Sequence, residues 1–145
     1  MQTELSQYKA IIGIDWADKK HDVCVQSAAS GRRQSYQVPH KAEKLDEWAR
    51  SLHRQHGGPI AIALELSKGP IVSVLQKYDF IVIFPIDPTT LANYRRTFTP
   101  SGAKDDPTDA EYALNLLLMH TEHFAPLRPQ SVEMQIGRAS CRERV

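Results

Sequence analysis

Three aspartates fall within five residues of the segment PSGAKDDPTDAEYAL, at Asp105, Asp106 and Asp109. Asp106 and Asp109 are three positions apart, so on a helix their side chains share one face. Like charges on one face repel, and the helix dipole offsets only about 0.3–1 kcal/mol for each acid near the N-terminus. A divalent cation would remove that repulsion. The alternative is that these acids only cap the helix and stabilise its first turn.

Two further acids each end an apolar run: Asp15 follows AIIGI, residues 10–14, and Glu65 follows IAIAL, residues 60–64. Runs this apolar are typical of strands buried on both faces, and ligands of α/β proteins bind where such strands end. A carboxylate buried there without a cation costs on the order of several kcal/mol. The alternatives are an Asp15 that forms a turn and a Glu65 that points into solvent.

Four acids, Asp15, Glu65, Asp106 and Asp109, are therefore the candidate catalytic and metal-binding residues. Mg²⁺ prefers hard oxygen ligands, usually one or two carboxylates together with a substrate phosphate. In phosphoryl transfer, two such ions about 4 Å apart activate the attacking oxygen and stabilise the leaving one. The predicted cofactor is Mg²⁺ (or Mn²⁺).

A small basic and aromatic patch precedes the acidic segment. It consists of Tyr94, Arg95 and Arg96, with Lys104 further along the chain. Such side chains are suited to contacts with the phosphates of a nucleic acid. The alternative is a solvated helix end.

The apolar pattern predicts the elements that would position these residues. Three short strands, residues 10–14, 22–27 and 34–38, form a meander. His21 and Asp22 are expected at an exposed hairpin tip, and the alternative is an acid/base pair. Further elements follow in the order helix 41–56, strand 60–64, helix 69–78, strand 80–84, helix 87–96 and helix 107–120. This order predicts an α/β fold with a mixed five-stranded sheet, the first three strands antiparallel, flanked by helices.

Single residues in this pattern carry further expectations. Asp87 is a candidate N-cap, and Pro88 suits the first position of the helix that follows. Helix 41–56 should stop at Gly57. Gly13 is expected to let another element approach the strand of Asp15 closely.

Bulk composition indicates a soluble cytoplasmic domain. The chain has 145 residues, 41% of them hydrophobic and 24% charged, and a net charge of +1. It has no apolar run of the roughly 20 residues that span a bilayer, and no signal-peptide pattern. The last ten residues, IGRASCRERV, match the translation of a common sequencing adapter. We expect a domain at residues 1–124, the start of a linker at 125–135 and non-native read-through at 136–145.

The segments GIDWADKKHDVCV, ALELSKGP and KDDPTDAEYAL resemble the N-terminal RuvC-like, RNase H-type domain of the DEDD transposases of bacterial insertion sequences, the one-ten family, and of the pilin-gene invertase. The resemblance covers roughly residues 8–124. It implies an RNase H-like fold, DNA transposition and Mg²⁺ bound by Asp15, Glu65, Asp106 and Asp109. Two departures stand out: Asp105 replaces the family's usual threonine, and the loop after Glu65 has one extra residue before its glycine.

The resemblance also implies partners. Full-length members cleave and exchange DNA strands as oligomers, are guided by an RNA that the element encodes, and carry a nucleophilic serine on a second, C-terminal domain. The sequence stops before that domain, so we expect a truncated transposase. Two alternatives stay open: a non-catalytic nucleic-acid-binding or assembly fragment, and an actin-like ATPase, for which the sequence lacks a second glycine-rich phosphate loop.

Overall fold

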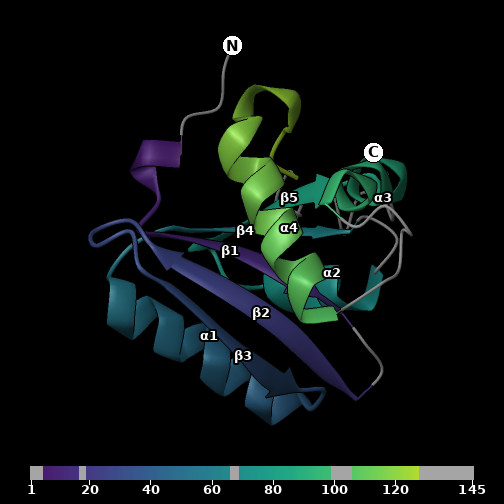
Figure 1. Ribbon diagram of the computed structural model, residues 1–145. Helices are drawn as coiled ribbons and strands as arrows, with labels where there is room; N and C mark the ends of the chain where they lie inside the picture. The colour runs from purple at the N-terminus through teal and green to yellow at the C-terminus, as the bar shows by residue number, and fades with distance from the viewer. Residues whose placement is uncertain (1–4, 17–18, 66–68, 99–105, 128–145) are drawn as a thin grey trace, which may run out of the picture.

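A five-stranded sheet with helices on both faces forms the centre of the molecule (Figure 1). The computed structural model describes residues 5–16, 19–65, 69–98 and 106–127. Its strands are β1 (Ala10–Asp15), β2 (Lys20–Ser27), β3 (Arg33–Pro39), β4 (Ile60–Glu65) and β5 (Ile81–Ile86). The helices are α1 (Ala42–His56), α2 (Gly69–Gln76), α3 (Pro88–Phe98) and α4 (Asp106–Met119), with short 3₁₀ turns at Leu5–Gln7 and Thr121–His123.

The strands lie in the order β3-β2-β1-β4-β5. β1 and β2 are antiparallel, as are β2 and β3, while β4 runs parallel to both β1 and β5. The prediction of a mixed sheet whose first three strands are antiparallel is therefore confirmed, and the fold is consistent with a RuvC-like domain.

Each face of the sheet packs against its own pair of helices. α1 and α2 contribute Leu45, Trp48 and Leu75 to one buried cluster. α3 and α4 contribute Leu91 and Leu114, among others, to the cluster on the opposite face. In Figure 1, α1 lies below the sheet and α4 crosses in front of it. Because helices cover both faces, the central strands are apolar throughout instead of alternating with polar residues.

At Gly13 of β1, the backbone of α4 approaches the strand closely. A Cβ atom at Gly13 would lie 2.0 Å from the carbonyl oxygen of Ala110 and 2.7 Å from the backbone nitrogen of Leu114. Only a residue without a side chain fits this gap. The expectation that Gly13 permits a close approach is confirmed, and the approaching element is α4.

Two predicted helix ends are also confirmed. The Thr89 amide donates a hydrogen bond to the Asp87 carboxylate over 3.1 Å, as an N-cap requires. α1 ends at Gly57, whose φ of 73° is left-handed and whose amide donates to the carbonyl of His53.

Two strand boundaries differ from the prediction. β2 begins at Lys20, so His21 and Asp22 are buried strand residues, and the expectation of an exposed hairpin tip was wrong. β5 continues through Pro85 to Ile86, although proline usually ends a strand. β5 lies at the edge of the sheet, where the missing proline N–H interrupts no hydrogen bond to a further strand.

Within the described residues, no helix combines the length and the apolar character needed to cross a membrane.

Candidate functional site

Asp15 and Glu65 lie at the same edge of the sheet, because they end the neighbouring parallel strands β1 and β4. Side chains alternate along a strand, so each acid faces the same way as the residue two positions before it. Those residues are Gly13, which contacts α4, and Ala63, which packs in the cluster under α3 and α4. Both carboxylates therefore belong to the face covered by α3 and α4. Asp15 is buried and Glu65 half-buried.

Asp109 reaches this place from α4. It lies one turn into the helix, and its neighbour Ala110 makes the close contact with Gly13. The Asp109 side chain is only 1% exposed. Asp106 is the first residue of α4, and its side chain lies outside the described part of the structure.

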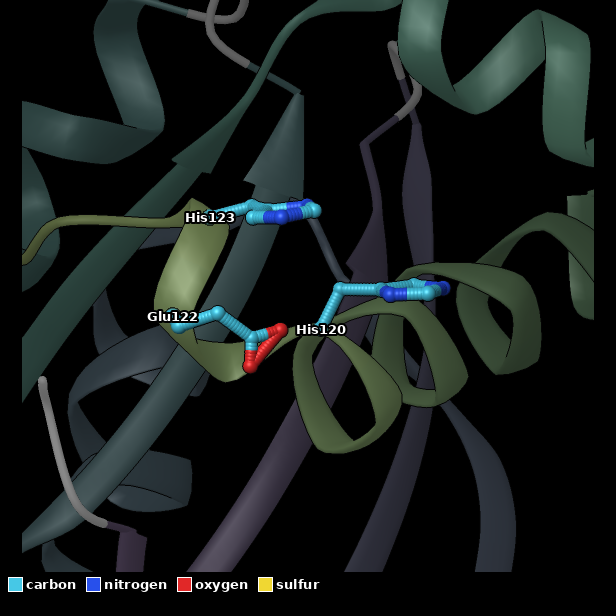
Figure 2. Close-up of side chains that lie close together, drawn as sticks. All are labelled: His120, Glu122 and His123. Atoms are coloured by element: carbon cyan, nitrogen blue, oxygen red, sulfur yellow. The ribbon is translucent and has the colours of Figure 1, made fainter.

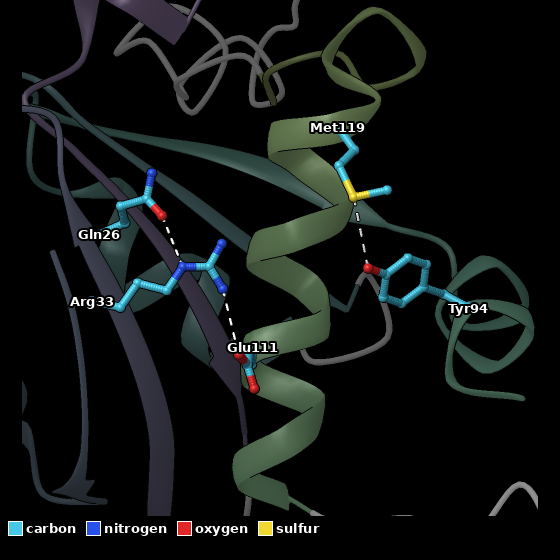
Figure 3. Close-up of polar contacts among 5 residues, drawn as sticks. All are labelled: Gln26, Arg33, Tyr94, Glu111 and Met119. Carbon is cyan, nitrogen blue, oxygen red and sulfur yellow. Dashed lines mark hydrogen bonds and ion pairs between the residues drawn. The ribbon is translucent and has the colours of Figure 1, made fainter. Parts of the chain in front are cut away.

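Further contacts hold α4 against the sheet and against α3. Arg33 of β3 donates to the Gln26 amide oxygen over 2.8 Å and pairs with Glu111 of α4 over 3.5 Å (Figure 3). On the other side of α4, the Tyr94 hydroxyl of α3 lies 3.8 Å from the sulfur of Met119. These contacts link the helix that carries Asp109 to β3 and to α3.

Arg95 of α3 is bound to Asp109 through two nitrogens of its guanidinium group. Nε donates to Oδ1 over 2.9 Å and Nη2 to Oδ2 over 3.1 Å, with 14% of the arginine side chain exposed. The hydrogen bond to Asp109 raises the pKa of Arg95 most, burial lowers it, and the negative charges of Asp109, Glu65 and Asp15 raise it further. One guanidinium is thus within electrostatic reach of three of the four predicted acids.

Asp22 is a fifth acid beside this group, and the sequence reasoning missed it. It pairs directly with Asp15 in the β1–β2 register, and only 7% of it is exposed. Residues directly opposite on antiparallel strands face the same side, with Cβ atoms about 4.5–5.5 Å apart. The Gln37 amide donates to Asp22 Oδ1 over 3.2 Å. The polar-apolar alternation of DVCVQS, combined with the predicted antiparallel pairing, could have indicated this position.

The residues of the predicted nucleic-acid patch have different environments in the structure. Tyr94 packs its ring against Phe98 and Tyr112, with centroids 5.0 and 5.3 Å apart. Arg95 is directed to Asp109. Arg96 is exposed and donates to the side chain of Asn93. Lys104, like Asp105, lies outside the described residues.

A second group of possible ligands, His120, Glu122 and His123, lies beyond the far end of α4 (Figure 2). Their donor atoms are all within 4.8 Å of one another. The two imidazole rings are stacked, with centroids 5.6 Å apart and planes 6° from parallel. Lone pairs lie in the ring planes, so in this arrangement they do not converge on one ion. The group is roughly 15 Å from Asp109 along the helix axis and is separate from the acid site.

The acid site offers the ligand chemistry of a hard divalent cation. Asp15, Glu65 and Asp109 supply only carboxylate oxygens, the donors that Mg²⁺ and Mn²⁺ prefer. Asp15 and Asp109 are buried, and a buried carboxylate needs a cation. Arg95 brings one positive charge to these carboxylates, and a divalent ion would add two.

Comparisons with known proteins agree on one family. A family model described as transposase, for the DEDD enzymes of IS110 elements, matches residues 12–144. The chain is also 36% identical over 110 residues to a protein of Sinorhizobium fredii (strain NGR234) named as a transposase, y4uE. The aligned region covers 72% of this chain and 30% of that relative, so the chain spans less than a third of the relative's length.

Proposed function

Because the chain belongs to the DEDD transposase family of IS110 elements, we propose that it is the metal-binding catalytic domain of a DNA transposase. Its ligands are Asp15, Glu65, Asp106 and Asp109, and its cofactor is Mg²⁺ or Mn²⁺. Members of this family are enzymes that act on DNA, and the family generally uses divalent metals. Family membership favours this function over an actin-like ATPase.

One observation carries the proposal: the enclosed pair of Arg95 and Asp109 belongs to the helices that cover the sheet face of Asp15 and Glu65, and the charges of all three acids raise the pKa of Arg95. These acids come from β1, β4 and α4, and residue 109 is far from residues 15 and 65 in the sequence. A helix-capping role explains neither the burial of Asp15 at the end of a strand nor the enclosed pair of Asp109 with Arg95.

Bound divalent ions would activate the attacking oxygen and stabilise the leaving oxygen of a phosphodiester. The residues of this chain supply the rest. Asp15 and Glu65 present their carboxylates from strand ends, and the contact of Gly13 with Ala110, the neighbour of Asp109, holds this part of α4 against β1. Fixed ligands of this kind lower the reorganisation that the reaction requires.

The proposal extends to the whole enzyme. In it, the acid site cleaves DNA at the ends of an insertion sequence and takes part in strand exchange, guided by an RNA that the element encodes, within a homo-oligomer. In this proposal Tyr94, Arg96 and Lys104 contact the phosphate backbone. The exposed position of Arg96 supports its part in this role.

Thermal unfolding in the presence of metal tests the site. Adding Mg²⁺ or Mn²⁺ to the metal-free chain should stabilise the folded state by ~2.7 kcal/mol at one hundred times Kd, which raises Tm by roughly 9 °C. Replacing both strand-end ligands, Asp15→Asn with Glu65→Gln, should abolish this rise.

The matched control removes two carboxylates elsewhere. Glu43→Gln with Glu47→Gln changes exposed acids of α1 and lowers the negative charge equally. It should leave the metal response intact. A wild-type Tm that does not respond to either ion, or a control that loses the response equally, would contradict the proposed site.

A further inference from the structure

We propose that Arg95 is a built-in counter-cation, which occupies Asp109 while the site is empty of metal and competes with the divalent ion for that carboxylate. This inference rests on the proposed function, because it assumes that Asp109 is a metal ligand. It gives Arg95 a role in metal loading in place of the predicted contact with nucleic acid.

The geometry shows how completely Arg95 holds Asp109. The two nearly parallel hydrogen bonds, 2.9 and 3.1 Å long, engage both carboxylate oxygens. Such a bidentate pair is the strongest arrangement that an arginine and a carboxylate can form. The side chain of Asp109 is almost fully enclosed, and that of Arg95 largely so. The pair is thus part of the buried structure, unlike the exposed pair of Arg33 with Glu111.

Charge is the reason for competition. A divalent ion bound by Asp15, Glu65 and Asp109 would bring two positive charges to the carboxylate that already binds a guanidinium. Positive charges a few ångströms apart repel strongly where water is excluded. Metal binding therefore requires Arg95 to withdraw from Asp109, and the apparent affinity for metal is reduced by the fraction of molecules in which it has withdrawn.

A different role for Arg95 makes the opposite prediction. A carboxylate has lone pairs for more than two partners, so Arg95 could orient Asp109 and remain bound when the ion arrives. Removal of such a positioning residue weakens metal binding, typically 10–100-fold for outer partners of metal ligands. The sign of the change in affinity therefore separates competition from positioning.

The experiment measures Mn²⁺ affinity directly, by calorimetry and by the paramagnetic signal of free Mn²⁺, on the full 145-residue chain. Arg95→Met removes every donor of the side chain while keeping much of its length. We expect it to bind Mn²⁺ about tenfold or more tightly than the wild type, because the competent fraction rises towards one. The matched control is Arg54→Met, which removes an exposed arginine of α1 and should leave the affinity unchanged.

A second variant covers the possibility that Arg95→Met does not fold, since it leaves the buried Asp109 without its cation. Arg95→Lys keeps the charge but loses the planar fork, so it should hold Asp109 less firmly and bind Mn²⁺ more tightly than the wild type. Suppose that the wild type binds Mn²⁺ and that the folded Arg95 variants bind it equally or more weakly. The competition by Arg95 is then wrong, but the proposed metal site is supported. If neither the wild type nor any variant binds, the proposed site itself is overturned.

Discussion

His21 is a buried histidine whose surroundings oppose protonation. Its ring stacks on Trp16, with centroids 3.5 Å apart, and its Nε2 shares a hydrogen bond of 3.2 Å with His40 Nδ1. Burial, and to a smaller extent the charge of His40, lower the pKa of His21 from 6.5 to about 4. The neutral ring therefore packs against Trp16, the residue that comes directly after Asp15 in the chain.

This histidine should make folding stability depend on pH. The unfolded chain binds a proton at His21 below pH 6.5, whereas the folded chain binds it only near pH 4. Between these values the unfolded state holds more protons, so the free energy of unfolding falls as the pH is lowered, by up to ~3 kcal/mol. Urea denaturation from pH 4.5 to 7 measures the slope.

Other groups titrate in the same pH range. The contribution of His21 to the slope is therefore measured as the difference between the wild type and a variant without it. His21→Gln should show a shallower dependence than the wild type. Gln55→Ala, which changes an exposed residue of α1 that does not ionise, should keep the wild-type slope. Equal slopes in the wild type and His21→Gln would contradict the assignment.

Asp22 adds a carboxylate to the face of the sheet that also carries Asp15. Like charges directly opposite on neighbouring strands destabilise a sheet. Asp22→Asn removes one charge and keeps an oxygen for the Gln37 amide. In metal-free buffer it should therefore raise stability by about 0.5 kcal/mol, measured by urea denaturation. A loss of stability would indicate that Asp22 needs its charge in the folded state.

At the scale of elements, α4 and β1 are held in direct backbone contact by Gly13. Gly13→Ala places a methyl group 2.0 Å from the Ala110 carbonyl oxygen, so α4 must move away from the strand. We expect a loss of ~3 kcal/mol of stability, at the upper end of overpacking effects. The metal-induced rise in Tm should fall as well, because Asp109 moves with α4.

Gly31→Ala is the comparison for this variant. It introduces a methyl group at a φ of 73°, with no atom within 4 Å of the added carbon. Its cost should be roughly 1–2 kcal/mol, from backbone conformation alone, with a full metal response. If both variants lose the same stability and the same response, the contact of Gly13 with α4 does not position Asp109.

Much of this element structure could be predicted from the sequence, because its signals are local. The sequence signals were apolar runs, the Asp87-Pro88 pair and Gly57. They predicted all five strands and four α-helices of the described residues, with boundaries within two residues. Pairings between distant residues left no such signal. Arg95 and Asp109 lie on different helices, fourteen residues apart, so neither pattern nor spacing indicated their hydrogen bonds.

At the scale of the whole molecule, the fold has two buried clusters that do not depend on metal. One lies under α1 and α2, the other under α3 and α4, and both consist of apolar side chains. The buried carboxylate of Asp109 has its own cation in Arg95. We therefore expect the chain to stay folded in excess EDTA, unlike small domains whose folding free energy comes from metal binding.

Circular dichroism and thermal melting of the chelated protein measure this expectation. The far-UV spectrum should match that of a mixed α/β domain, and unfolding should remain cooperative. Loss of the cooperative transition in EDTA would show that metal, and not Arg95, compensates the charge of Asp109. Under the same conditions Arg95→Met should melt below the wild type, because it lacks that compensation.

The contact between Gly13 and Ala110 also constrains how such a sequence can diverge. A strand and a helix nearly a hundred residues apart in the chain meet there backbone to backbone, so no side-chain rotation can absorb a change at position 13. Across homologues, we expect glycine at this position wherever the helix keeps its place. Lineages that accept a larger residue should show compensating changes along the inner face of α4, so positions 13, 110 and 114 should vary together.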